Sequence, residues 1–138
     1  MDEKLTVLNT VEMISQLMGE LESKAFEMEG FSDVTMNQMH YLDTIAHLEK
    51  PTFGELAEDL GVTRPSVSVI VKKLIDAGYL TKSQSQHDRR VYFLQLTKKG
   101  KRFNELHNEV HRILAARITE NLSKSEIKAL SGLLEKIT

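Results

Sequence analysis

The stretch Thr52–Gly78, TFGELAEDLGVTRPSVSVIVKKLIDAG, decides the fold. Thr52 begins a short helix with Glu55 three residues later, a spacing typical of a capping box. Gly61 then stands where a tight turn needs a residue that tolerates positive φ. Thr63 is the N-cap candidate of the next helix, in which apolar residues recur at helical spacing up to Ala77-Gly78. The stretch therefore predicts two helices joined by a tight turn.

The period of the apolar residues changes from 3.6 to 2 directly after this stretch. Tyr79–Gln84 and Arg90–Leu96 are predicted to be strands, because their apolar and polar residues alternate. The connection Ser85–Arg89 is short and polar, as a hairpin turn requires. A helix, a tight turn, a helix and a hairpin in this order are typical of a winged helix-turn-helix domain.

Long amphipathic helices flank this domain. Apolar residues from Val7 to Met28 step by four and three, a heptad-like seam that Gly30 ends. We expect a mainly α fold with a two- to three-stranded β wing, and an intertwined helical dimerisation region. The predicted division is a DNA-binding domain over 33–100 and a dimerisation region over 1–32 and 101–138.

The terminal seams also predict a homodimer. A chain of 138 residues holds no further layer to cover them, and pairing two copies would bury them and relate two DNA-reading helices by a two-fold axis. The alternative is a bundle within one chain that packs on the DNA-binding domain.

The charge is unevenly distributed along the chain. The net charge is −2, yet ten basic and two acidic residues lie between Arg64 and Arg102, a local charge of +8. A basic middle between acidic ends is typical of a protein that binds a polyanion. A solvated charged face is the alternative that composition alone leaves open.

Several classes of protein are excluded by what the sequence lacks. It has no cysteine, which rules out disulfides and thiolate metal sites and fits a cytoplasmic location. No apolar run approaches the ~18 residues of a membrane span, and the N-terminus MDEKL does not have the pattern of a signal peptide. Without a phosphate loop or nucleophile motif, we expect no enzyme and no required cofactor.

The outward face of the second helix carries side chains suited to DNA. Ser68 can hydrogen-bond to base edges, Val69 can touch a thymine methyl group, and Arg64 can reach a guanine or a phosphate. A solvated helix face is the alternative, and so is a protein-docking module, which would expose more aromatic residues. The residues predicted to bind DNA here are Thr63, Arg64, Pro65, Ser66, Ser68, Val69, Lys72 and Lys73.

The hairpin tip adds Asp88, Arg89 and Arg90 to the predicted DNA-binding residues. Two guanidinium groups on a protruding turn suit a narrow, electronegative minor groove. An acidic residue beside DNA is unusual unless it orients an arginine through a bidentate hydrogen bond. A surface ion pair without a role in binding is the alternative.

These motifs resemble the MarR family of transcriptional regulators. The resemblance rests on Phe53–Ala57, Leu60–Thr63, Gly78–Leu80, Asp88–Val91 and Leu96–Gly100, which read FGELA, LGVT, GYL, DRRV and LTKKG. It implies an obligate homodimer with intertwined first and last helices, which acts as a repressor on a pseudo-palindromic double-stranded DNA operator. It also implies that Asp88 and Arg90 set the wing's minor-groove contact and that a small effector modulates binding.

Histidines on the helices raise the question of a metal. His107 and His111 lie at i, i+4 on one helical face, His40 lies on the second predicted helix, and Glu22 offers a carboxylate. Such residues can bind zinc, and their positions are similar to those of a zinc-responsive branch of the family. They are similar as well to the branch that represses fatty-acid synthesis genes. We expect no physiological metal, because packed interface histidines or an organic effector pocket explain the same residues.

Overall fold

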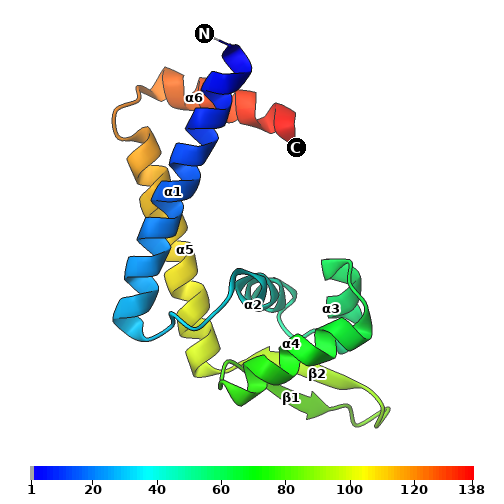
Figure 1. Cartoon of the computed structure of the whole chain (residues 1–138). Coiled ribbons are helices and arrows are strands. Elements are labelled where there is room, and N and C mark those ends of the chain that lie inside the picture. Colours follow the sequence, from blue (N-terminus) through cyan, green and yellow to red (C-terminus); the bar gives the residue numbers. More distant parts are fainter. Residues whose placement is uncertain (1) are drawn as a thin grey trace. The chain divides into compact units, whose positions relative to one another are not determined.

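The computed structural model describes residues 2–138, and helices make up most of it (Figure 1). The predicted fold class is confirmed: the fold is mainly α, with one antiparallel two-stranded sheet. No helix in the described part is long and apolar enough to cross a membrane. In chain order the elements are α1 (Glu3–Glu29), α2 (Met36–Leu48), α3 (Phe53–Leu60), α4 (Arg64–Asp76), β1 (Leu80–Gln84), β2 (Tyr92–Leu96), α5 (Lys98–Thr119), α6 (Lys124–Leu134) and the 3-10 helix η1 (Glu135–Ile137).

The chain divides into two compact units. Phe26–Leu106 forms the first, which we call the winged unit. Met1–Ala25 and His107–Thr138 form the second, which we call the helical unit. The sequence predicted a domain over 33–100. The winged unit begins before that range, at Phe26, and ends after it, at Leu106.

Side-chain caps begin the helices of the winged unit. The Thr35 hydroxyl accepts from the Gln38 amide while the Gln38 side chain accepts from the Thr35 amide, so the two residues form a capping box at the start of α2. The Thr52 hydroxyl accepts from the Glu55 amide at the start of α3. Gly61 ends α3 with φ +67°. A side chain at this position would strain the left-handed backbone, which is why the tight turn needs glycine.

The wing consists of β1 and β2, paired in antiparallel register from Leu80 opposite Leu96 to Gln84 opposite Tyr92. An isolated antiparallel bridge joins Thr52 to Phe93 beside the two strands. The second strand begins at Tyr92 and not at Arg90 as expected, because the Val91 amide donates to the Asp88 carbonyl and keeps Arg90 in the turn.

An aromatic cluster explains the extent of the winged unit. Phe26 and Phe103 stack with ring centroids 4.9 Å apart, and Phe31 and Tyr79 pack around them. All four side chains are buried. Met28, the last residue of the predicted seam on the first helix, is 79% exposed in the single chain. Phe26, which lies outside that seam, is buried in the core of the winged unit.

The LTKKG motif joins the end of α4 to the start of α5. The Thr97 hydroxyl donates to the Gly78 carbonyl and accepts from the Gly100 amide. The Lys99 ammonium donates to the Ala77 carbonyl at 2.8 Å and lies 4.4 Å from the Tyr79 ring centroid. A cation near the last carbonyls of a helix stabilises it. Lys99 belongs to the basic stretch between Arg64 and Arg102, but its ammonium already contacts the Ala77 carbonyl and the Tyr79 ring.

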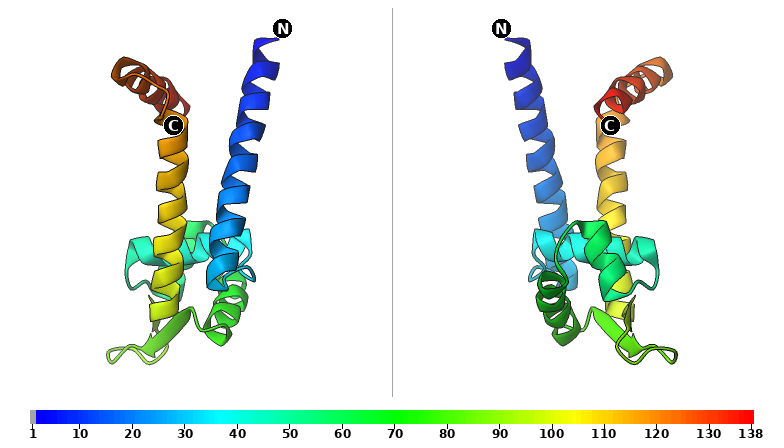
Figure 2. Two further views of the ribbon diagram at one scale, coloured as in Figure 1. Left: turned by 90° about the vertical axis from the view of Figure 1, so that its left-hand side faces the viewer. Right: turned by 90° about the vertical axis from the view of Figure 1, so that its right-hand side faces the viewer.

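The helical unit leaves much apolar surface uncovered. In Figure 2 the N-terminal part of α1 stands apart from α6, and α6 has no buried residue. Val7, Val11 and Ile137 are 63%, 53% and 77% exposed. Apolar side chains that recur on helices without a neighbouring layer are typical of a surface that another chain covers.

Candidate nucleic-acid interface

Helix α4 presents every residue that the sequence predicted for it. The helix buries Val67, Val71 and Leu74 and turns its opposite face outward. The Thr63 hydroxyl accepts from the Ser66 amide as the predicted N-cap. The predicted residues that are exposed on this face are Thr63, Arg64, Pro65, Ser66, Ser68, Val69, Lys72 and Lys73.

The side chain of Arg64, at the start of α4, lies against Gly54 of α3. A Cβ atom added at Gly54 would lie 2.6 Å from Nη2 of Arg64 and 3.1 Å from its Cζ. The guanidinium therefore occupies the space that the missing side chain leaves. Sequence reasoning identified Arg64 but missed Gly54, since nothing in the spacing indicates that these two residues meet.

The wing tip is built around Asp88. Its carboxylate accepts from the Arg90 amide at 3.0 Å and binds the Arg90 guanidinium through two hydrogen bonds of 3.1 Å. These hydrogen bonds from the Arg90 side chain and amide hold the pKa of Asp88 below its usual range. The predicted bidentate contact is confirmed. The Arg90 side chain is nevertheless 90% exposed, so the guanidinium is oriented and remains open to a ligand.

Backbone contacts keep the same turn in place. The Ser85 hydroxyl accepts from the amides of His87 and Asp88, and the Gln84 side chain donates to the Arg89 carbonyl at 2.8 Å. Arg89 itself is exposed. These hydrogen bonds fix the backbone of the turn that carries Arg89 and Arg90.

A groove of about 740 Å³ separates α4 from the wing within the winged unit. Its lining includes four basic side chains and one carboxylate: Arg64, Lys72, Lys82, Arg90 and Asp76. Lys82 was missing from the predicted site residues. It lies on β1 with its ammonium 5.0 Å from the Tyr92 ring centroid, and its membership of the basic stretch was the signal that could have identified it.

One ion pair partly neutralises this face. Lys72 contacts Asp76 at 3.1 Å, with side chains that are 77% and 66% exposed. A pair this exposed contributes about 0–1 kcal/mol. Lys72 can therefore leave Asp76 for a phosphate at little energetic cost.

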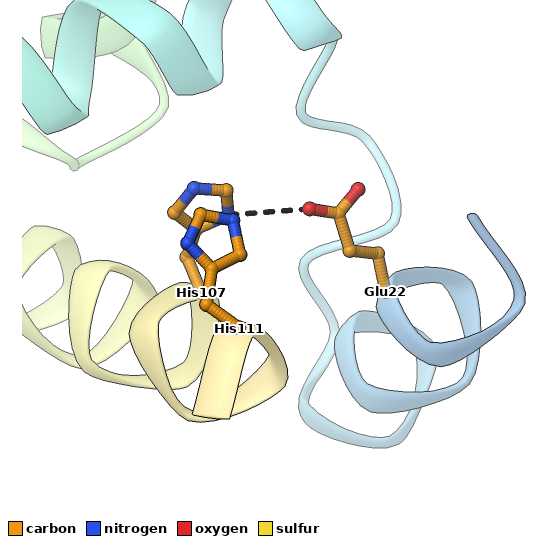
Figure 3. Close-up of side chains that lie close together, drawn as sticks. All are labelled: Glu22, His107 and His111. Atoms are coloured by element: carbon orange, nitrogen blue, oxygen red, sulfur yellow. Dashed lines mark ion pairs between the residues drawn. The ribbon is translucent and has the colours of Figure 1, made fainter. Parts of the chain in front are cut away.

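Three of the four candidate metal residues lie close together in the helical unit. Glu22, His107 and His111 form a group whose ligand atoms lie within 4.8 Å of one another (Figure 3). His40 lies on α2 in the winged unit, and its part in a metal site stays a prediction.

Comparisons with known proteins show which proteins this chain is similar to. The model of the MarR family matches residues 34–92. The helix-turn-helix transcriptional regulator YhjH of Bacillus subtilis (strain 168) is 30% identical over 96 residues, which are 70% of this chain and 55% of YhjH. The chain thus spans little more than half of that relative. TcaR of Staphylococcus aureus (strain Newman), also a helix-turn-helix transcriptional regulator, is 29% identical over 80% of this chain and 74% of its own.

A solved structure resembles nearly the whole chain. It is that of FabT from Streptococcus pneumoniae in complex with DNA, with a TM-score of 0.83 and 26% identity. The alignment covers 99% of this chain and 94% of FabT.

Proposed function

Since the chain belongs to the MarR family, we propose that it is a sequence-specific DNA-binding transcriptional regulator that contacts double-stranded DNA through α4 and the wing. The observation that carries this proposal is the groove in which Arg64 and Lys72 of α4 face Arg90 of the wing. A helix and an arginine-tipped hairpin on one basic face suit two adjacent grooves of a duplex. The similarity to FabT, whose structure is a complex with DNA, supports the same assignment.

Each part of the interface has its own chemistry. Ser68 and Val69, exposed in the middle of α4, offer a hydroxyl and a small apolar group to base edges in the major groove. Lys72 and Lys73 suit phosphates, which fix the register of the protein on DNA. Arg90, oriented by Asp88, enters the minor groove, where the negative potential attracts a guanidinium.

The functional form is a homodimer in this proposal. Exposed apolar side chains on both terminal helices favour it, among them Val7 and Val11 of α1 and Leu133 of α6. Burying a fully exposed side chain of this size contributes about 1.5–3 kcal/mol, and these partly exposed ones contribute less each. Two copies related by a two-fold axis would present two α4 helices to a pseudo-palindromic operator.

A dimer on such an operator would exclude other proteins from overlapping DNA, which makes repression the expected direction of regulation. The relatives are named as transcriptional regulators and not as enzymes, so the proposal includes no catalytic step. Its place of action is the cytoplasm, where bacterial DNA lies. A small effector stays a prediction.

Titration of a fluorescent duplex enriched from random sequences tests the proposal. We expect Arg90→Ala to weaken binding by about 1–3 kcal/mol while leaving the melting temperature unchanged. Lys128→Ala removes a positive charge that is also exposed, on α6, and serves as the control. Equal affinities for Arg90→Ala and Lys128→Ala would contradict the proposal.

A further inference from the structure

The inner face of the hairpin carries a lysine among apolar residues. Leu80 and Leu94 on this face are buried in the core of the winged unit. Lys82 stands directly opposite Leu94 in the antiparallel register, and residues that stand opposite each other share a face of the sheet. Alternation along the strand would place an apolar side chain at this position, so the lysine needs an explanation of its own.

An aromatic ring orients the ammonium group of Lys82. Its Nζ lies 5.0 Å from the ring centroid of Tyr92, within the range of a cation–π interaction. None of the ion pairs within residues 2–138 involves Lys82, whereas Lys72, on the opposite wall of the groove, is paired with Asp76. The ring holds the charge in place without neutralising it, so the ammonium stays available to an anion.

The groove between α4 and the wing is where such an anion would lie (Figure 1). Lys82 and Tyr92 line this groove together with Lys72 and Arg90. Under the proposed function, α4 enters a major groove and the wing enters the adjacent minor groove. One sugar-phosphate strand separates two adjacent grooves of a duplex, so this strand has to pass between α4 and the wing.

We propose that Lys82, positioned by the ring of Tyr92, binds a phosphate of this strand. The inference rests on the proposed function and adds to it a phosphate contact from the floor of the wing, beside those of Lys72 and Lys73 on α4. A contact to phosphate carries no sequence information, so Lys82 contributes alike to the binding of every duplex. Tyr92 acts through Lys82 and is a positioning residue.

A lysine on the inner face of an exposed hairpin has another explanation. Charged side chains that point inward keep an edge strand from pairing with a strand of another molecule. In that case Lys82 and Tyr92 would protect and stabilise the hairpin, and Lys82 would release no counterion from DNA. The two explanations therefore differ in the salt dependence of duplex binding.

Measurement of that salt dependence by fluorescence anisotropy tests the proposal. We expect Lys82→Gln to lower the slope of the logarithm of affinity against the logarithm of salt concentration by about one unit. Binding to the enriched duplex and to a scrambled one should weaken alike, by about five- to tenfold at ~0.1 M salt. Lys82→Arg keeps the charge and should keep the slope of the unsubstituted chain.

Variants of Tyr92 test its positioning role. Tyr92→Phe keeps the ring and should bind DNA like the unsubstituted chain, whereas Tyr92→Leu should weaken binding by about threefold. Tyr92→Leu should have no further effect in a chain that already carries Lys82→Gln, because the two residues act as a unit. Additive losses would contradict the positioning role.

Lys50→Gln is the matched control. The Lys50 ammonium lies 5.7 Å from the ring centroid of Phe93, which follows Tyr92 in β2 and so points to the opposite face of the hairpin. Lys50 does not line the groove, and its substitution should leave the slope unchanged. Equal slopes for Lys82→Gln and Lys50→Gln would overturn the proposal, and the proposed function would stand if the unsubstituted chain still preferred the enriched duplex. A lowered slope in Lys82→Gln without that preference would support the phosphate contact and contradict sequence-specific binding.

Discussion

Arg90 lies across the carboxylate of Asp88 at the wing tip, with its Nε and Nη2 each 3.1 Å from a carboxylate oxygen. The same carboxylate accepts the Arg90 amide, so one residue orients both the backbone and the side chain of the other. A preformed guanidinium loses less freedom on binding than a mobile one. This makes Asp88 a positioning residue for the contact that Arg90 is proposed to make.

Asp88→Ala should therefore weaken specific DNA binding although it removes a negative charge beside a polyanion. We expect a loss of about fivefold against the selected duplex, together with an unchanged or slightly higher affinity for random duplexes. Fluorescence anisotropy with both duplexes measures this. Stronger binding to both duplexes would mean that Asp88 acts only through its charge.

The pH dependence of this pair follows from the sign of the shift. The pKa of Asp88 is lowered by the hydrogen bonds from Arg90, so the pair is intact above the usual carboxylate range and is lost only as the pH falls through the lowered value. The difference in affinity between Asp88→Ala and the unsubstituted chain should accordingly stay constant between pH 6 and pH 8.

Gly54→Ala should displace the Arg64 guanidinium, because the new Cβ would lie 2.6 Å from Nη2. The clash involves the far end of a flexible side chain, so the melting temperature should change little. Duplex affinity should fall about as far as in Arg64→Ala, by about 1–3 kcal/mol. In a double-mutant cycle the two changes should not add. Full additivity would show that Gly54 acts on binding by another route.

Tyr79 should make the winged unit sensitive to alkali. Burial, followed by the charge and the hydrogen bond of Asp33, raises the pKa of Tyr79 to about 12. A raised pKa means that the contribution to stability is complete below about pH 10 and is lost as the pH rises toward 12. Urea unfolding should therefore lose more stability across this window in the unsubstituted chain than in Tyr79→Phe. Parallel curves for the two proteins would contradict this.

Local signals in the sequence were sufficient for the helix-turn-helix. The hydroxyls of Thr52 and Thr63 accept from backbone amides three residues later, and Gly61 adopts a left-handed backbone. Such local roles can be predicted from residue type and spacing. The Asp88–Arg90 pair also spans only two residues, and it was predicted for the same reason.

Long-range contacts were not predictable in this way. Arg64 lies ten residues after the glycine that makes room for it, and Phe26 stacks on Phe103 from the other end of the unit. The heptad pattern gave no sign of the role of Phe26, because periodicity locates a face of a helix but not its contact with a distant aromatic side chain. Such contacts depend on the tertiary fold, which a single sequence does not display.

Charge on the apolar face of α1 should dissociate the proposed dimer. The unsubstituted chain should sediment at micromolar concentration with twice its mass of 15.7 kDa. Val11→Glu places a charge where Val11 is 53% exposed in the single chain and should shift the protein toward monomer. Gln16→Glu adds the same charge on the opposite side of the helix and should not. A monomeric unsubstituted chain would contradict the dimer.

Selection from a random duplex library tests the central claim, sequence-specific DNA binding by α4 and the wing, most directly. The account predicts enrichment of an inverted repeat with half-sites about 10 base pairs apart. The enriched duplex should bind at least ~10³-fold more tightly than a scrambled one at physiological salt, and affinity should fall steeply as salt rises. Equal affinity for the enriched and scrambled duplexes would contradict it.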